Sequence, residues 1–329
     1  MVRQIRILFE GAFYHVLNRG QGKRDIFLND NDYKDFLRII KETCQLHEVT
    51  IVSYCLMPNH YHLLVHTPNA NLPDFMRQLN GVYTQDFNRR YKHDGPLFKG
   101  RYKAIVVQEG SYLLQLIKYF HNNPVKAGIV QKNSFYAYSS HNNYIRQEEN
   151  EWLRFLDLLR SQFAQKKNLK NAYMDFMKTN NDKAEEFLRE KSKKAVNAII
   201  YGDEAYMDEI KIKYLQGKSL SGEIPQAKQI DNDLKIKKIK KEVIEVFKIK
   251  EKNLYYSVRG RENIPRIMAI SLSRECSGLS YDKIAQIFGG IKYKSAAKYC
   301  ERIKQRCESD ERFKSLFDEL KRRCSQVET

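Results

Sequence analysis

Apolar and polar positions along the first 130 residues follow two different periods. Segments of β-branched and aromatic residues whose side chains alternate between faces predict strands. Segments with apolar residues three or four positions apart predict helices. We predict strands over residues 14–20, 50–56, 60–67 and 103–108, and helices over 32–46, 72–91 and 112–123. This order is typical of an antiparallel sheet with packed helices, an α+β fold, with Pro124 and Gly128 ending the last helix.

The pattern changes after residue 150. Aromatic and aliphatic residues recur at helical spacing as far as residue 250, and no strand-like segment appears among them, so we expect connecting helices. Residues 217–229 contain Gly222 and Pro225 and predict a flexible linker. Residues 234–244 are basic and amphipathic, which is typical of a solvated helix face.

Residues 251–310 have the pattern of a separate small helical unit. We predict a helix over residues 264–277, a break at Gly278, and a second helix over 280–288 that Ser280 caps. A Gly-Gly turn at 289–290 and a basic helix over 295–307 follow. This order is typical of a helix-turn-helix domain that binds DNA, although helical hairpins that only pack together share it. We therefore predict three parts, residues 1–145, 146–250 and 251–329.

The charge of the chain narrows the class of partner. Lys and Arg number 58 against 40 Asp and Glu, which gives a net charge of +18 and favours a polyanion, most simply nucleic acid, over an anionic membrane surface. No apolar run approaches the roughly 18 residues of a spanning helix, and Glu10 interrupts the N-terminus before a signal-type core forms. The six cysteines include no Cys-x-x-Cys pair, so we expect a reduced, cytoplasmic protein without zinc or disulfides.

Residues 57–64 read Met-Pro-Asn-His-Tyr-His-Leu-Leu and carry the strongest candidate chemistry. On a strand, His60 and His62 point to the same face, whereas on a helix they would lie about 200° apart. Two imidazoles on one face can hold a metal ion, although buried histidines with ordinary hydrogen-bond partners give the same pattern. About sixty residues further on, Tyr119 and Asn123 share one helix face because they are four residues apart. Taken alone, Tyr119 would be an ordinary surface or core aromatic residue, and Asn123 would be a turn residue before proline.

Five motifs occur in one order along residues 1–145. They read Tyr-His-Val-Leu-Asn-Arg-Gly at 14–20, Met-Pro-Asn-His-Tyr-His-Leu-Leu at 57–64, Gly-Pro-Leu-Phe-Lys-Gly-Arg-Tyr at 95–102, Tyr-Phe-His-Asn-Asn-Pro-Val-Lys-Ala-Gly-Ile-Val at 119–130 and Tyr-Ser-Ser at 138–140. In order and spacing they resemble the single-tyrosine HUH transposases, most closely the REP-associated tyrosine transposase type. The resemblance implies the HUH fold, a ferredoxin-like antiparallel sheet with packed helices, here followed by an all-α region ending in the helix-turn-helix domain.

The resemblance also implies roles for particular residues. His60, His62 and Asn123 would hold Mg²⁺ or Mn²⁺, with Asn123 where insertion-sequence members usually have Gln. Tyr119 would be the nucleophile that leaves a 5′-phosphotyrosine and a free 3′-hydroxyl, a link that allows rejoining without ATP. Tyr61 stands where a bulky apolar residue is usual and is expected to point away from the metal. His15 and His121 could support the ligand residues from behind, and His66 lies too far along the strand to join them, so all three are expected to be structural.

The C-terminal unit resembles a second family. Residues 270–290, from Ile-Ser-Leu-Ser-Arg-Glu to Gln-Ile-Phe-Gly-Gly, are similar to the DNA-binding domain of the replication initiator DnaA, and the resemblance covers residues 260–308. After the double glycine that family has Arg-Asp-His-Ser-Thr-Val, whereas this chain has Ile-Lys-Tyr-Lys-Ser-Ala at 291–296. The resemblance therefore implies the fold but not the initiator's target sequence. The candidate phosphate or groove contacts are Lys292, Lys294, Ser295 and Lys298.

The resemblance, together with the positive charge, implies a transposase-type enzyme, a metal-dependent DNA transesterase that cleaves and rejoins single-stranded DNA at hairpin or REP-like sequences. We expect the protein in the cytoplasm, at the nucleoid, with no membrane partner. The sequence does not decide between a monomer and a homodimer. The alternative is a non-catalytic DNA-binding regulator, which the intact histidines, tyrosine and asparagine argue against. Relaxases, a third class, place the tyrosine before the histidines. Rolling-circle initiators share the order found here and are excluded only by the flanking motifs.

Overall fold

The computed structural model describes residues 6–179, 184–186, 199–215, 225–256 and 262–325. Contacts between Cα atoms divide the chain into two compact units, Gln4–Ile210 and Lys211–Thr329. Each unit has its own core of buried apolar side chains. Among the described residues, no helix is both long enough and apolar enough to cross a membrane.

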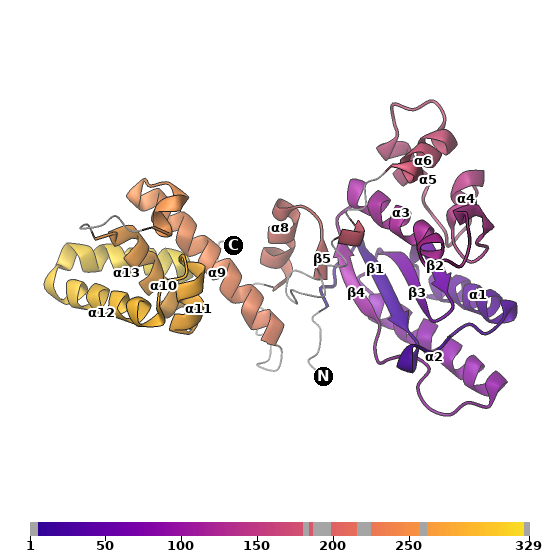
Figure 1. Ribbon diagram of the computed structural model, residues 1–329, viewed down its shortest axis with the longest axis horizontal. Coiled ribbons are helices and arrows are strands. Elements are labelled where there is room, and N and C mark those ends of the chain that lie inside the picture. Colours follow the sequence, from indigo (N-terminus) through magenta and orange to yellow (C-terminus); the bar gives the residue numbers. More distant parts are fainter. Residues whose placement is uncertain (1–5, 180–183, 187–198, 216–224, 257–261, 326–329) are drawn as a thin grey trace. The chain divides into compact units, whose positions relative to one another are not determined.

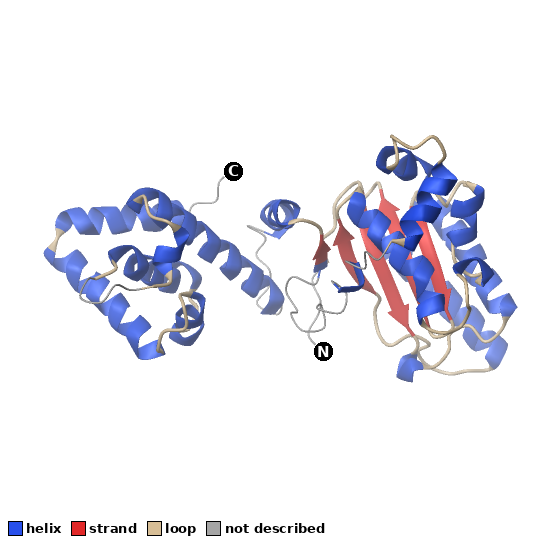
Figure 2. Cartoon of the chain, turned by 45° about the horizontal axis from the view of Figure 1, so that its top comes forward, coloured by secondary structure: helices blue, strands red, loops and turns tan. Residues whose placement is uncertain are grey.

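The N-terminal unit is built around one five-stranded sheet in the order β2-β3-β1-β4-β5 (Figures 1 and 2). Its strands are β1 (Ala12–Arg19), β2 (Thr50–Met57), β3 (His60–Thr67), β4 (Lys103–Val107) and β5 (Ile200–Tyr201). The first four pair antiparallel, which confirms the predicted sheet. The fifth pairs in parallel with β4, so the sheet is mixed and the expectation of no strand after residue 150 is wrong. Two residues are too few to show a period, and β5 forms only because its backbone meets the edge of β4.

Helices cover both faces of this sheet (Figure 2). The helices of the predicted core are α1 (Asp30–His47), α2 (Leu72–Tyr91) and α3 (Ser111–Lys126). On one face, Tyr61 of β3 packs 5.1 Å from the ring of Phe36 in α1 and donates its hydroxyl to Asn80 of α2 at 2.7 Å. On the other face, Phe120 of α3 packs 5.2 Å from the ring of His62. The sheet therefore separates Tyr61 from the histidines, as expected from the alternation of the strand.

Helix α3 continues past Pro124, so the predicted end of this helix at Asn123 is wrong. The proline lies in the last turn, where its missing N–H removes only one helical hydrogen bond. The amides of Ala127 and Ile129 then bond to the carbonyls of Asn123 and Pro124, at 2.9 Å each. Gly128 follows with a φ of +70° and ends the helix, as predicted.

Short helices continue the N-terminal unit beyond α3. They are η2 (Asn133–Phe135), α4 (His141–Arg146), α5 (Leu156–Gln162), α6 (Leu169–Lys178) and the first part of α8 (Glu204–Leu215), while η1 (Gln21–Lys23) follows β1. The boundary between the two units, at Ile210 and Lys211, falls within α8. The prediction of connecting helices in this stretch is confirmed apart from β5. Residues 184–186 are also helical, and lie between segments outside the described residues.

The C-terminal unit is helical. Its elements are α9 (Pro225–Phe247), η4 (Glu251–Leu254), α10 (Ile264–Ser277), α11 (Tyr281–Ile287), α12 (Tyr293–Ser309) and α13 (Glu311–Ser325). The predicted helix over 264–277 is confirmed, and Ser280 accepts a hydrogen bond from the amide of Lys283 as the cap of α11. Because Pro225 suits the first position of a helix, α9 begins there, and the linker predicted over 217–229 is wrong for residues 225–229. Residues 216–224 lie outside the described residues.

The turn between α11 and α12 depends on Gly289. Its φ is +90°, and a Cβ at this position would lie 2.7 Å from the carbonyl oxygen of Tyr255. The neighbouring carbonyl of Phe288 accepts a hydrogen bond from Arg266 of α10 at 2.7 Å. The predicted order of helix, Gly-Gly turn and basic helix is therefore present, and it is fixed against α10.

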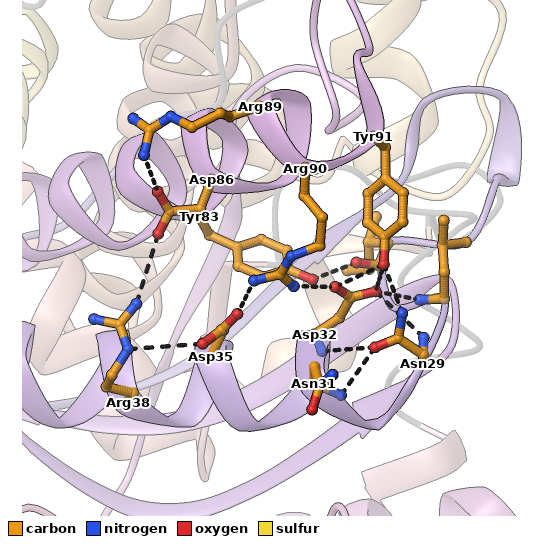
Figure 3. A network of polar contacts seen from close by, with 12 residues as sticks. Asn29, Asn31, Asp32, Asp35, Arg38, Tyr83, Asp86, Arg89, Arg90 and Tyr91 are labelled. Atoms are coloured by element: carbon orange, nitrogen blue, oxygen red, sulfur yellow. Dashed lines mark hydrogen bonds and ion pairs between the residues drawn. The ribbon is translucent and has the colours of Figure 1, made fainter.

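A polar network at Asp32 joins the start of α1 to the end of α2 (Figure 3). The carboxylate of Asp32 is fully buried and accepts hydrogen bonds from the amide of Leu28 at 2.8 Å and the hydroxyl of Tyr91 at 2.8 Å. Arg90 forms an ion pair with the same carboxylate. Asn29 caps the helix by accepting from the amides of its first turn. The network fixes the two helices that support the Tyr61 face of the sheet.

We predict that Asp32→Ala lowers the free energy of unfolding by about 2–4 kcal/mol, because the amides of Leu28 and Asn29, the hydroxyl of Tyr91 and the cation of Arg90 lose their buried acceptor. The matched control is Asp175→Ala, which removes an exposed i,i+3 pair with Lys178 and should cost about 0.5 kcal/mol or less. Denaturant titration of both variants measures the difference. Equal stabilities of the two variants would contradict the role given to Asp32.

Candidate active site

Strand pairing places His60 and His62 on the sheet face that α3 covers. In the antiparallel ladder of β1 and β3, Leu17 lies opposite His62 and Arg19 lies opposite His60. Opposed residues of an antiparallel pair share a face. The two imidazole rings are therefore neighbours, with centroids 5.0 Å apart in an edge-to-face arrangement. The predicted two-histidine face is present.

The hydrogen bonds of His60 define which of its nitrogens can bind a ligand. Its Nδ1 lies 2.6 Å from Oδ1 of Asn59, and the amide nitrogen of Asn59 donates to the carbonyl of Lys23 at 3.2 Å. The second contact orients the amide so that its oxygen faces the imidazole, and Nδ1 must then carry the proton. Burial, followed by the charge of Arg19, lowers the pKa of His60 to about 4. At neutral pH the ring is thus uncharged, with a lone pair on Nε2.

His62 is held in a similar way by a second histidine. Its Nδ1 lies 2.9 Å from Nε2 of His15, and both side chains are 5% exposed or less. Burial lowers the pKa of His62 well below its ordinary value, and the nearby imidazoles of His15 and His60 lower it further. Because Nδ1 is engaged, Nε2 is the nitrogen of His62 that remains for a ligand. A hydrogen bond to the second nitrogen is the usual way in which a metal-binding histidine is oriented.

Helix α3 brings Tyr119 against this pair. The ring of Tyr119 lies 5.5 Å from that of His62, edge to face. The tyrosine is half-buried, and burial raises its pKa above the ordinary value, with the negative charge of Glu185 acting in the same direction. The phenol is therefore protonated at neutral pH, so a nucleophilic role requires that its proton be removed during the reaction.

Asn123 lies one turn further along α3, on the same helix face as Tyr119. Its amide nitrogen is buried and has no hydrogen-bond partner in the part of the chain that the structure describes. Its side chain makes no hydrogen bond to either histidine among the described residues. The link between Asn123 and the histidines is therefore its position on α3, one turn from Tyr119. A buried amide atom without a partner is costly unless a ligand binds the group, and exchange of the two amide atoms would present the oxygen instead.

These residues fit a divalent cation. Two imidazoles with available Nε2 atoms and an amide whose hydrogen bonds are incomplete supply a mixed nitrogen and oxygen ligand set. Among the described residues, no group of three or more His, Cys, Asp or Glu could hold a metal ion by itself. A site at this position therefore depends on the amide and on water or substrate oxygens.

A buried network behind α3, which the sequence did not reveal, fixes the tyrosine helix. Nε2 of His121 lies 2.8 Å from Oγ of Ser140, and its Nδ1 lies 2.7 Å from the hydroxyl oxygen of Tyr173. The same hydroxyl lies 2.6 Å from Nδ1 of His141, and Ser53 of β2 lies 3.1 Å from Nε2 of His121. The Tyr-Ser-Ser motif at 138–140 thus contributes a structural hydroxyl, and the expected structural role of His121 agrees with its contacts.

Residues beyond α6 also hold α3. Lys118, next to the tyrosine, is buried and donates to Oγ1 of Thr179 at 2.8 Å. Lys126 forms an ion pair with Glu185. The helix that carries Tyr119 is therefore supported along its length by side chains that follow it by roughly 50 to 60 positions in the sequence.

The candidate DNA contacts of the C-terminal unit lie at the start of α12. Lys292 is the N-cap residue of this helix, and Lys294 and Lys298 follow on its first two turns, all three exposed. Ser295 is half-buried, and its amide donates to the carbonyl of Lys292 at 2.8 Å. The three lysines are thus open to solvent, whereas Ser295 is in part a residue of the turn.

Comparisons with known proteins show similarity in the N-terminal part of the chain. Residues 9–123 match the model of the family described as "Transposase IS200 like". A protein of Haemophilus influenzae classed as a REP-associated tyrosine transposase is 26% identical over 150 residues, which cover 42% of this chain and 85% of that protein. The resemblance inferred from the motifs is therefore confirmed for this segment.

Two solved structures also show similarity. A REP-associated tyrosine transposase bound to a REP hairpin is 16% identical, with a TM-score of 0.40, and the match covers 47% of this chain and 92% of that chain. A protein of Deinococcus radiodurans classed as a transposase is 20% identical, with a TM-score of 0.27, covering 37% of this chain and 97% of that chain.

The buried histidines make the stability of the N-terminal unit sensitive to acid. Burial lowers the pKa of His141 to about 4 and that of His121 well below its ordinary value. Below about pH 6.5 these histidines are protonated in the unfolded chain but remain neutral in the folded chain. Each of them therefore lowers the free energy of unfolding by up to about 1.4 kcal/mol for each unit by which the pH falls. We predict a loss of stability between pH 6.5 and 4, measurable by denaturant titration at several pH values. His141→Gln should reduce this slope by up to one proton, and an unchanged slope would contradict the prediction.

Proposed function

We propose that this chain, whose residues 9–123 form an IS200-like transposase domain, cleaves and rejoins single-stranded DNA through a covalent bond between Tyr119 and a 5′-phosphate. The observation that carries the proposal is the contact of the Tyr119 ring with His62, at 5.5 Å, beside a second imidazole that also retains its Nε2. A nucleophile and two metal-binding groups from different elements thus meet at one place. The excess of basic residues suits a DNA substrate.

In the proposed reaction the oxygen of Tyr119 attacks the scissile phosphorus, and the bond from phosphorus to the 3′-oxygen breaks. The tyrosine gives up its proton and the departing 3′-oxygen gains one, so the products are a 5′-phosphotyrosine and a 3′-hydroxyl. The phosphodiester energy is kept in the new bond, so the reverse attack by a 3′-hydroxyl rejoins the strand. A divalent ion, Mg²⁺ or Mn²⁺, held by His60, His62 and Asn123 would polarise the phosphate.

The residues around the histidines have a positioning role in this scheme. Asn59 and His15 each engage the Nδ1 of one ligand histidine, which fixes its tautomer and the direction of its Nε2. The depressed pKa of His60 and His62 keeps both rings neutral at physiological pH, as ligation requires. The folded sheet thus prepares the site before any ion binds.

The substrate in our proposal is a hairpin or a REP-like sequence with an adjacent single strand. Support comes from the five motifs and from the name of the Haemophilus influenzae relative, and not from a contact within this chain. We propose that residues 251–329, within the C-terminal unit, form a helix-turn-helix domain that binds duplex DNA through the start of α12. Such binding would keep the protein at the nucleoid.

We predict that Tyr119→Phe abolishes covalent adducts with single-stranded oligonucleotides, by at least about 10³-fold, because the nucleophilic oxygen is removed. Affinity for the same DNA should stay within about threefold, since the phenyl ring is kept. The assay traps adducts from a library of hairpins in the presence of Mn²⁺ and resolves them by denaturing electrophoresis. Tyr112→Phe is the matched control, because Tyr112 lies on the same helix but packs against Tyr201 at 5.0 Å.

Adducts that persist in Tyr119→Phe would show that another residue is the nucleophile. Wild-type protein that binds hairpin DNA with no adduct in Mn²⁺ or Mg²⁺ would instead favour the non-catalytic regulator.

A second prediction concerns α12. Replacing Lys294 and Lys298 together by Ala should reduce the dependence of duplex affinity on salt by about 0.9 logarithmic units for each phosphate that is no longer neutralised. Lys314→Ala on α13, whose ammonium pairs with Glu311, should leave the slope unchanged. Fluorescence anisotropy between 50 and 200 mM salt, about the usual range for such titrations, provides the slopes. Equal slopes for the double variant and the wild type would rule out these lysines as phosphate-binding groups.

A further inference from the structure

Arg19 is a cation without an acidic partner at the edge of the candidate active site. It ends β1 directly opposite His60, and its side chain is half-buried. Within the described ranges, its guanidinium makes no ion pair and no hydrogen bond. By contrast, Arg90 of α2 pairs with Asp32 and Asp35. Among the described residues, the guanidinium of Arg19 is therefore available to an anionic ligand, whereas that of Arg90 is already neutralised.

The backbone at Arg19 is fixed, so its position is not that of a loose strand end. Its carbonyl accepts the amide of Lys99 at 2.8 Å, and its own amide donates to the side chain of Asn18 at 3.0 Å. The next residue, Gly20, forms an antiparallel bridge with Phe98. The rigid backbone directs the guanidinium from the same sheet face that presents the two histidines.

The electrostatic surroundings of Arg19 favour an anion. The charge of Arg19 reaches His60, because it contributes to the lowered pKa of that ring after the effect of burial. Lys103, exposed on the neighbouring strand β4, lies opposite Leu17 and thus on the same face. Arg19 and Lys103 thus place two cations on the sheet face that presents the histidines.

We propose that Arg19 is a catalytic residue that binds the non-bridging oxygens of the scissile phosphate and balances the charge that develops on them. This inference rests on the proposed function. As the bond from Tyr119 to phosphorus forms and the bond to the 3′-oxygen breaks, negative charge accumulates on the non-bridging oxygens. Arg19 stays protonated throughout, and the only proton that moves leaves Tyr119 and ends on the 3′-oxygen. The planar guanidinium can donate two parallel hydrogen bonds to a phosphate, which a lysine cannot do.

The test compares Arg19→Gln and Arg19→Lys with wild type on two oligonucleotides. One has an ordinary phosphodiester at the cleavage position, and the other has a neutral methylphosphonate there. On the phosphodiester, Arg19→Gln should slow single-turnover adduct formation by about 10²-fold, and Arg19→Lys should recover part of that rate. On the methylphosphonate the penalty should fall to within about threefold, because the charge that Arg19 stabilises is absent. Arg77→Gln, on an exposed part of α2, is the control and should match wild type on both substrates.

Two results would overturn the assignment. Arg19→Gln could form adducts at the wild-type rate, or it could show the same penalty on both substrates, which is what a merely structural role produces. Thermal unfolding and Mn²⁺ affinity of the variants should equal those of wild type, and a decrease in either would also point to a structural role. Equilibrium binding of the two oligonucleotides needs no cleavage and therefore separates this inference from the proposed function. Wild type should prefer the phosphodiester even if it forms no adduct, and Arg19→Gln should show no such preference.

Discussion

The register of β3 between its two neighbours is the constraint on which the candidate site depends. Pairing with β1 and with β2 fixes which side chains of β3 face α3. A slip of one residue would exchange the faces, bringing Tyr61 under α3 and His62 against α1 and α2. The aromatic packing of Tyr61 with Phe36 and its bond to Asn80 oppose such a slip. The core on one face of the sheet thus determines the chemistry on the other.

Much of the fold follows from local patterns in the sequence. The bounds of β3, α2 and α10 agree with the predicted ranges, since each is a long segment with one clear period. The errors have a common origin in tertiary contacts. The two residues of β5 are a strand only because the edge of β4 is available, and α3 passes Pro124 because the last turn tolerates a missing donor. A proline read as part of a linker begins α9, a position that proline also suits.

The candidate site was predictable to a smaller extent. The two-residue spacing of the histidines and the four-residue spacing of Tyr119 and Asn123 each define a face, but only the fold brings His62 and Tyr119 into contact. The bond from His15 to His62 joins residues 47 positions apart, and that from Tyr173 to His121 joins residues 52 positions apart. Neither has a local pattern, and His15 was expected to be structural. Likewise, only the structure shows that the guanidinium of Arg19 has no acidic partner among the described residues.

The central claim is that two imidazoles from one strand bind a single divalent ion beside Tyr119. Pulsed electron paramagnetic resonance of the Mn²⁺-loaded protein tests it most directly, because couplings to ligand nitrogen count the imidazoles that are bound. The account predicts nitrogen couplings from two histidines, one of which disappears in His60→Ala and the other in His62→Ala, while Tyr119→Phe retains both. A spectrum of Mn²⁺ coordinated only by water, or one that neither histidine substitution changes, would contradict it.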